Sequence, residues 1–313
     1  MMKRALGSTG LQVSALGLGC NNFGGRLDSE RTKLVVDAAI AAGITFVDTA
    51  DAYGNRGGSE RMLGETLGNR RKDVVLATKF GLPMDETGRL KGASRAYVMT
   101  AVDESLKRLK TEWIDLYYLH RPDPATPIEE TLRALQDLVR QGKVRFTGCS
   151  NLSGPQLADS IEVARAQELE PFAAAQDEYN LLSRGIESDL LPVIERHGMA
   201  LVPYFPLASG LLTGKYRKGQ PMPPGTRLSE QRFSARFMGE KNIAVVEQLA
   251  VFCAERGRTM LQLAFGWLLS RSCVASIIAG ATSPEQVQQN TDALGWQMTS
   301  DELAAIDRIA AGR

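Results

Sequence analysis

The sequence is poor in the residues that build metal centres and disulfide frameworks. It has four cysteines and two histidines among 313 residues. The histidines, His120 and His197, form no His-x-x-x-His pair, and the cysteines have no close pair and no metal-like spacing. We therefore expect no metal site, and a reduced, cytoplasmic protein.

Charge of one sign and long apolar runs are also scarce. The formal net charge is +1, which gives no electrostatic argument for a nucleic-acid or membrane-surface partner. No stretch reaches the length of a membrane-spanning helix, and the first residues lack the apolar core of a signal peptide. Hydrophobic residues make up 43% and charged residues 23%, values typical of a globular protein with an ample core.

Short apolar runs alternate with helical patterns along most of the chain. Runs without polar alternation are typical of parallel strands that are buried on both faces. The length would also allow two ordinary domains, but no linker or composition break divides the chain. Eight β/α units fit an α/β fold, a single (β/α)8 TIM barrel over 1–313. We predict strands at 16–20, 44–48, 74–79, 115–120, 144–149, 173–176, 199–204 and 275–279, and helices at 29–42, 59–69, 94–109, 128–141, 153–166, 186–197, 241–256, 259–270, from 283 onward and at 300–310.

Two further segments stand outside this alternation. Residues 3–6 and 11–15 flank a Gly-Ser-Thr-Gly turn and predict an N-terminal β-hairpin. The segment 205–240 is rich in glycine and proline and lacks regular periodicity. A loop of that length in a compact fold is usually functional.

Titratable residues end three successive predicted strands. Asp48, Lys79 and His120 occupy these positions, and Tyr53 follows Asp48 in a small-residue loop before Ser59, a candidate helix cap. In a barrel the carboxyl ends of the strands meet at one mouth. An Asp–Lys pair can be a core salt bridge and a tyrosine can be packing, but their convergence favours catalysis, with a cation near Tyr53 lowering the phenol pKa.

Four short motifs lie around these residues in a fixed order. They are Asp-Thr-Ala-Asp-Ala-Tyr-Gly at 48–54 with Ser-Glu at 59–60 and Leu-Gly at 63–64, Leu-His-Arg-Pro-Asp at 119–123, Gly-Cys-Ser-Asn at 148–151, and Gln-Asp-Glu-Tyr-Asn at 176–180. In order and spacing the chain resembles the aldo-keto reductase family over nearly its whole length. The likeness is to the long-chain bacterial type, in the group that includes potassium-channel beta subunits.

The resemblance implies a catalytic tetrad of Asp48, Tyr53, Lys79 and His120. The implied reaction is hydride transfer from a nicotinamide to the carbonyl carbon of an aldehyde or ketone. Tyr53 would act as general acid, Lys79 held by Asp48 would lower its pKa, and His120 would orient the carbonyl oxygen.

The sequence has no Rossmann glycine fingerprint and no P-loop. Residues 17–22 lack the third glycine, and 210–216 have three residues between the glycines and no hydroxyl residue after Lys215. The resemblance implies instead that Ser150, Asn151 and Gln176 bind the carboxamide, that Tyr204 stacks on the ring, and that a segment with Lys215 wraps the pyrophosphate. The adenosine phosphate would meet a helix N-terminus near Thr282. The predicted cofactor contacts are Gly19, Cys20, Asn21, Ser150, Asn151, Gln176, Tyr204, Phe205, Pro206, Leu207, Ser209, Gly210, Lys215, Gly280, Thr282, Gln286, Gln289 and Asn290.

The 2′-phosphate position departs from a pattern common in the family. Thr282 and Gln286 stand where an arginine often binds this group, so a bidentate charged contact is missing. We favour NADP(H) and allow NAD(H).

The predicted substrate contacts are Asn22, Phe23, Phe80 and Arg121, which follow strand ends. The phenylalanines are equally compatible with packing. Arg121 hints at a polar or anionic substrate group, although a surface salt bridge would also explain it.

Two other functions compete with carbonyl reduction. A Schiff-base barrel would use Lys79 as nucleophile, but Asp48 would keep the amine protonated. A non-catalytic, cofactor-sensing subunit would regulate a partner protein instead. The predicted ligand partner is a small carbonyl compound, and the sequence carries no signal for an oligomeric state.

Overall fold

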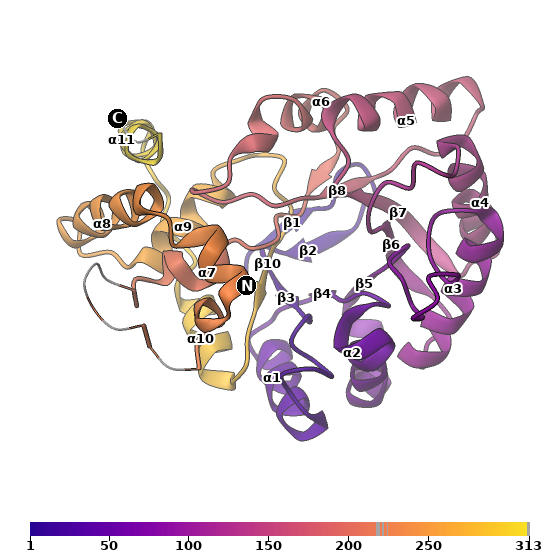
Figure 1. The fold of residues 1–313 in the computed structure, drawn as a ribbon, viewed down its shortest axis with the longest axis horizontal. Coiled ribbons are helices and arrows are strands. Elements are labelled where there is room, and N and C mark those ends of the chain that lie inside the picture. The colour runs from indigo at the N-terminus through magenta and orange to yellow at the C-terminus, as the bar shows by residue number, and fades with distance from the viewer. Residues whose placement is uncertain (217–219, 221, 224, 312–313) are drawn as a thin grey trace.

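The chain forms a barrel of eight parallel strands in this computed structural model (Figure 1). The structure describes residues 1–216, 220, 222–223 and 225–311. The strands are hydrogen-bonded in the order β10-β3-β4-β5-β6-β7-β8-β9, and a parallel bridge from Leu201 to Val274 closes the ring. The barrel strands are β3 (Leu16–Gly19), β4 (Phe46–Asp48), β5 (Val75–Phe80), β6 (Ile114–Leu119), β7 (Val144–Ser150), β8 (Ala174–Gln176), β9 (Ala200–Leu201) and β10 (Ile277–Gly280).

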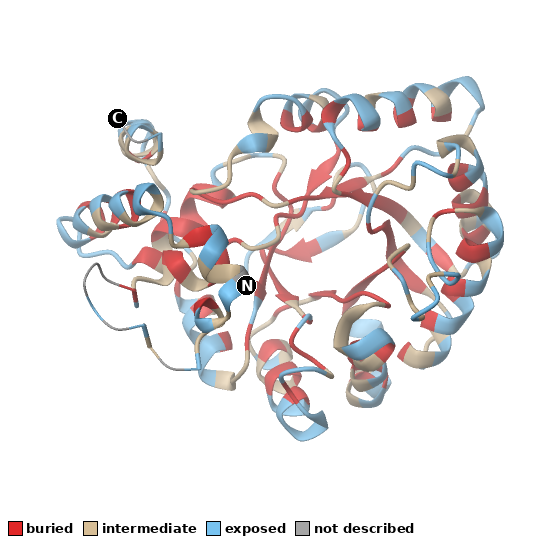
Figure 2. Cartoon of the chain, viewed as in Figure 1, coloured by how far each residue is buried: buried red, intermediate tan, exposed pale blue. Residues whose placement is uncertain are grey.

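Helices follow the strands and surround the barrel (Figure 1). The helices next to the sheet are buried on their inner faces and exposed on their outer faces (Figure 2). The predicted (β/α)8 architecture is therefore confirmed. The helices are α1 (Ser29–Ala41), α2 (Tyr53–Leu67), α3 (Arg95–Leu109), α4 (Ile128–Arg140), α5 (Gly154–Ala166), α6 (Leu190–Arg196), α7 (Gln231–Phe237), α8 (Glu240–Ala254), α9 (Met260–Leu269), α10 (Pro284–Asp292) and α11 (Ser300–Ala310), with short 3-10 turns η1 (Gly68–Asp73), η2 (Gly185–Glu187), η3 (Ala208–Thr213) and η4 (Arg227–Ser229). In contrast to the helices next to the sheet, α8 packs on α9 and α11.

The predicted hairpin closes the amino-terminal end of the barrel. Strand β1 (Lys3–Ala5) pairs antiparallel with β2 (Gln12–Ser14). Leu6 and Val13 are fully buried and pack with residues of the barrel interior. The hairpin turn lies against the backbone that enters β8 and β9, where a Cβ on Gly7 would stand 3.0 Å from a carbonyl oxygen.

The strand period of two determines which side chains enter the barrel. Alternate residues of a strand point to opposite faces. On β5, Val75 and Ala77 belong to the interior cluster, whereas Leu76 belongs to the cluster between sheet and helices. The same alternation carries Lys79 into the barrel. Asp48 and His120 each lie two positions after an interior residue, Phe46 on β4 and Tyr118 on β6, and therefore face the same side.

The prediction that Ser59 caps a helix is wrong. Helix α2 already starts at Tyr53, with a left-handed kink over residues 54–57. The Ser59 hydroxyl is buried and donates to the Cys20 carbonyl at 2.9 Å. Gly54 has φ 66°, and a Cβ there would stand 2.3 Å from the Phe23 carbonyl oxygen, so this close turn requires glycine.

The 205–240 segment contains more regular structure than its sequence predicts. It includes η3, η4 and the seven-residue helix α7, while 217–219, 221 and 224 lie outside the described residues. Seven residues give too few turns for a periodic apolar signal. Among the residues that the structure describes, no helix is long and apolar enough to cross a membrane.

Candidate active site

Lys79 lies at the centre of the predicted catalytic cluster. Its Nζ donates to Asp48 Oδ1 at 2.6 Å, to the Thr49 carbonyl at 2.7 Å and to the Tyr53 hydroxyl at 3.4 Å. An ammonium group is only a donor. The Tyr53 oxygen therefore accepts from Lys79, which leaves its own O–H free to donate elsewhere.

Asp48 and Lys79 form a fully buried ion pair, with side-chain exposures of 2% and 1%. The second carboxylate oxygen of Asp48 accepts from Gln176 Nε2 at 2.8 Å. Burial raises the pKa of Asp48, while Lys79 and Gln176 oppose that shift. Burial also favours the neutral amine, but Asp48 and Tyr53 outweigh it and raise the pKa of Lys79. Lys79 is therefore a persistent cation beneath Tyr53.

Burial raises the pKa of Tyr53, and the charge of Lys79 opposes this shift. We predicted a lowered phenol pKa. Lys79 acts in the predicted direction, but desolvation of the phenolate outweighs it in this structure. The consequence is a phenol that keeps its proton at neutral pH and is poised as a donor.

His120 packs edge-on against Tyr53, with ring centroids 5.7 Å apart. Burial, together with the charges of Lys79 and Arg121, holds the pKa of His120 well below its usual range. The imidazole is therefore neutral. Its Nδ1 has no hydrogen-bond partner among the residues described.

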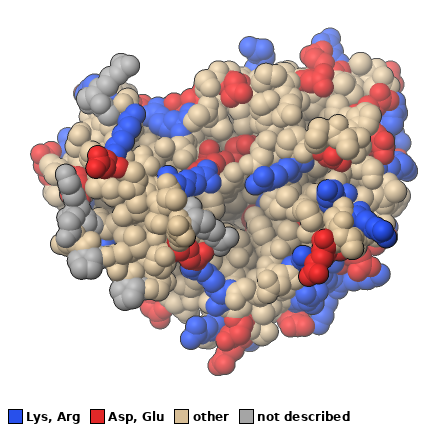
Figure 3. Space-filling view, viewed as in Figure 1, with Lys and Arg blue, Asp and Glu red and all other residues tan. Residues whose placement is uncertain are grey.

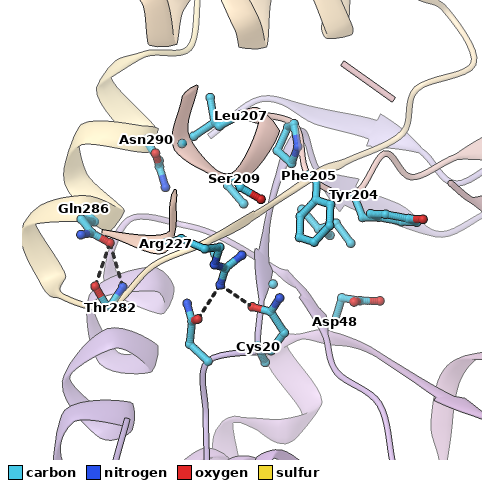
Figure 4. Close-up of a pocket in the computed structure, with 18 of the residues that line it drawn as sticks. Cys20, Asp48, Tyr204, Phe205, Leu207, Ser209, Arg227, Thr282, Gln286 and Asn290 are labelled. Carbon is cyan, nitrogen blue, oxygen red and sulfur yellow. Dashed lines mark hydrogen bonds between the residues drawn. The ribbon is translucent and has the colours of Figure 1, made fainter. Parts of the chain in front are cut away.

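A cavity of about 780 Å³ opens above this cluster. Asp48, Tyr53 and His120 line its floor, whereas Lys79 lies beneath them, fully buried. Every predicted cofactor residue lines the same cavity. These are Gly19, Cys20, Asn21, Ser150, Asn151, Gln176, Tyr204, Phe205, Pro206, Leu207, Ser209, Gly210, Lys215, Gly280, Thr282, Gln286, Gln289 and Asn290, of which Figure 4 labels several.

Asn151 connects two walls of the cavity. Its amide nitrogen donates to the His120 carbonyl at 3.1 Å and to Ser150 Oγ at 2.8 Å, and its oxygen accepts from the Tyr204 hydroxyl at 2.7 Å. Its φ is 61°, a left-handed conformation that asparagine tolerates better than most residues. These bonds fix the Tyr204 ring against the cavity.

The far end of the cavity has features of an anion site. The Ser209 hydroxyl is buried and has no partner in the described part of the chain. Gly210, with φ 103°, lies beside Lys215. At α10, Gln286 Oε1 accepts from the Thr282 amide at 2.9 Å and from its hydroxyl at 3.1 Å (Figure 4). An orphaned hydroxyl, a lysine and a helix start suit a dinucleotide phosphate.

The predicted substrate residues divide into two groups. Asn22 and Arg121 line the cavity. Phe23 and Phe80 are fully buried and are absent from its walls, so their prediction as substrate contacts is wrong. Phe80 packs on Tyr117, with ring centroids 4.8 Å apart, because its position on β5 points outward from the barrel.

Sequence reasoning missed three arginines that line the cavity, Arg26, Arg227 and Arg236. Arg227 donates to Asn22 Oδ1 at 2.6 Å (Figure 4), and Arg236 pairs with Glu178. Arg227 and Arg236 come from irregular or short segments that carry no positional signal. Arg26 lies in the loop between β3 and α1, too far past the strand end for strand-end reasoning to select it. Other missed lining residues are Thr213, Gly225, Thr226, Leu261, Ile278 and Ala279.

The fold and the cluster define a class: (β/α)8-barrel proteins with a buried Asp–Lys pair beneath a tyrosine and a neutral histidine. The Aldo/keto reductase family model matches residues 15–311, and the chain belongs to this family.

Three curated proteins illustrate the range of its relatives. The chain is 37% identical over 306 residues to a probable voltage-gated potassium channel subunit beta of Oryza sativa subsp. japonica, covering 94% of this chain and 91% of the relative. It is 35% identical over 324 residues to the L-glyceraldehyde 3-phosphate reductase of Escherichia coli (strain K12), covering 99% and 93%. A putative voltage-gated potassium channel subunit beta of Schizosaccharomyces pombe is 35% identical over 325 residues, covering 98% and 92%.

Proposed function

We propose that this chain is a nicotinamide-dependent carbonyl reductase that converts an aldehyde or ketone to the alcohol. The observation that carries the proposal is the Lys79–Tyr53 contact at 3.4 Å at the floor of a cavity of about 780 Å³. The contact with Lys79 orients a protonated phenol. A developing alkoxide needs such a proton donor as its general acid.

A nicotinamide held in the cavity would supply the hydride for the carbonyl carbon. Tyr53 gives its proton to the carbonyl oxygen, which balances the reaction as one hydride and one proton added. The charge of Lys79 stabilises the phenolate that remains, and Asp48 holds Lys79 in place. His120, as a neutral imidazole, donates a hydrogen bond that orients the carbonyl oxygen.

We propose that the cofactor is NADP(H) and that the protein also accepts NAD(H). The Ser209 hydroxyl, Lys215 and the α10 N-terminus would hold the phosphates, and the Tyr204 face would take the ring. Thr282 and Gln286 are neutral, so selectivity for the 2′-phosphate would rest on hydrogen bonds alone. A cytoplasmic location stays a prediction.

Two alternatives are weaker. Lys79 as a Schiff-base nucleophile conflicts with the direction of its pKa and with three donated hydrogen bonds. A partner-regulating subunit is favoured by the names of relatives that are probable or putative potassium channel beta subunits, and by no contact within the described site. That role would predict cofactor binding without turnover of any carbonyl compound.

The Tyr53→Phe variant tests the proposed acid. Loss of the phenolic proton donor should lower kcat by at least about 100-fold, the usual range for general acid catalysis, with little change in the Kd for NADPH. Steady-state turnover of an aldehyde panel and fluorescence titration measure the two quantities.

The matched control is Tyr97→Phe on α3, outside the cavity lining. It should turn over like the unmodified protein. Near-normal turnover of Tyr53→Phe would refute the assigned acid.

A further inference from the structure

The charged residues that line the cavity are strongly unbalanced. Five of them are cations, namely Arg26, Arg121, Lys215, Arg227 and Arg236, and within the described part of the chain the lining includes one acid, Asp48. Lys79 already neutralises Asp48. On the face that holds the opening, Figure 3 shows Lys and Arg side chains around the central hollow, with Asp and Glu side chains beside some of them.

Most of these cations already have partners. Arg26 pairs with Glu230 and Arg236 with Glu178, and Arg227 donates to the side-chain oxygens of Asn21 and Asn22.

Lys215 and Arg121 make no ion pair with any residue described in the structure. Lys215 lies beside Gly210, at the end where the cofactor phosphates are proposed to bind.

Arg121 lies at the opposite, reacting end. It directly follows His120, is exposed and lines the cavity. Its charge contributes to lowering the pKa of His120 and opposes the burial that raises the pKa of Tyr204 to about 12. The guanidinium field therefore reaches both walls between which the carbonyl would lie.

We infer that Arg121 selects substrates whose carbonyl group is joined by a short chain to an anionic group, a carboxylate or a phosphate. This inference rests on the proposed carbonyl reductase function. A guanidinium presents a planar fork of donors that matches both oxyanions. Because Arg121 makes no ion pair among the described residues and lines the cavity, that fork is available to a ligand.

The test compares matched pairs of aldehydes. One pair is 4-carboxybenzaldehyde and its neutral methyl ester, and the other is glycolaldehyde phosphate and glycolaldehyde. The unmodified protein should prefer the anionic member of at least one pair by about tenfold or more in kcat/KM. The pair that shows the preference tells whether the site prefers a carboxylate or a phosphate.

Arg121→Gln should lower kcat/KM for that anion by about 10- to 100-fold, mainly through KM, because a charged hydrogen bond is lost. The neutral member should lose much less, so that the preference for the anion itself falls.

Two further variants separate a local contact from overall charge. Arg121→Lys keeps the charge but not the fork, so it should retain an intermediate preference. Arg133→Gln on α4 removes the same charge from an exposed pair with Glu129, outside the cavity lining, and should leave the preference unchanged. Equal losses for both members of a pair in Arg121→Gln, or an equal effect of Arg133→Gln, would overturn the inference.

A binding measurement distinguishes failure of the inference about Arg121 from failure of the proposed reductase function. If neither member of either pair is reduced, the proposed function is refuted. Calorimetric titration with 4-(hydroxymethyl)benzoate and its methyl ester then still decides the role of Arg121. Tighter binding of the benzoate that is lost in Arg121→Gln supports the anion site, and equal binding of the two compounds refutes it.

Discussion

His120 shows how the barrel controls the protonation of a single residue. It lies at the end of β6, is 8% exposed and faces the permanent charge of Lys79, which contributes to lowering its pKa. The unfolded chain would bind a proton at the ordinary histidine pKa of 6.5, whereas the folded chain resists it. Below that pH the native state therefore binds fewer protons at His120 than the unfolded state does.

The sign of the resulting pH effect follows from linkage. A depressed folded pKa contributes stability that is present above pH 6.5 and is lost as the pH falls towards the folded pKa. Between pH 7.5 and 5.5 the free energy of unfolding should fall by about 1.4 kcal/mol more in the unmodified protein than in His120→Gln. Chemical denaturation at both pH values measures this. The control is His197→Gln, at an exposed histidine, and a loss in His120→Gln as large as in the unmodified protein would contradict the argument.

At the scale of elements, the strands were predictable and the connections were less so. The barrel strands and the strand-end residues Asp48, Lys79 and His120 follow from apolar runs, which are a local property. The kink at Gly54 and the short helix α7 depend on contacts with distant segments, such as the Phe23 carbonyl. The buried places of Phe23 and Phe80 were missed because the last residue of a strand, and a residue in the loop after it, can face either side of the sheet.

The N-terminal turn of α10 determines the proposed cofactor preference. Ser283 caps the helix, with Pro284 in its first turn, but Gln286 already occupies the Thr282 amide and hydroxyl. A 2′-phosphate would have to displace a neutral amide oxygen there. The turn therefore offers donors but no cation, and its one charged residue is the acid Glu285.

Thr282→Arg should shift the ratio of kcat/KM for NADPH over NADH towards NADPH by about tenfold, because a charge-assisted contact replaces a neutral one. The matched variant Gln286→Glu should shift the same ratio towards NADH, since a carboxylate repels the phosphate. Initial rates with both cofactors at a fixed aldehyde concentration give the ratio. Michaelis constants that are unchanged for both cofactors in both variants would exclude this turn as the 2′-phosphate site.

At the scale of the whole molecule, the two ends of the barrel have separate tasks. The carboxyl ends of the strands carry the cavity and the cluster around Lys79, and the hairpin β1–β2 covers the amino ends. The interior between them is packed with side chains such as Phe46, Leu116 and Tyr118, so the barrel, as far as the chain is described, is a core without a through channel. Stability at one end can therefore change without altering chemistry at the other.

Leu6→Ala tests this separation of stability from catalysis. Leu6 is fully buried, and truncation of such a leucine costs about 2–5 kcal/mol of unfolding free energy through lost burial and a residual cavity. Because the hairpin lies at the end opposite Tyr53, kcat per folded molecule should stay within about twofold of the unmodified value. Leu90→Ala, at a leucine that is 46% exposed, is the control and should cost less than about 0.5 kcal/mol. Denaturant unfolding and steady-state kinetics on the same samples measure both effects.

If Leu6→Ala costs no more stability than Leu90→Ala, the hairpin does not close the core. If it lowers kcat as strongly as Tyr53→Phe while the protein stays folded, the two ends are coupled.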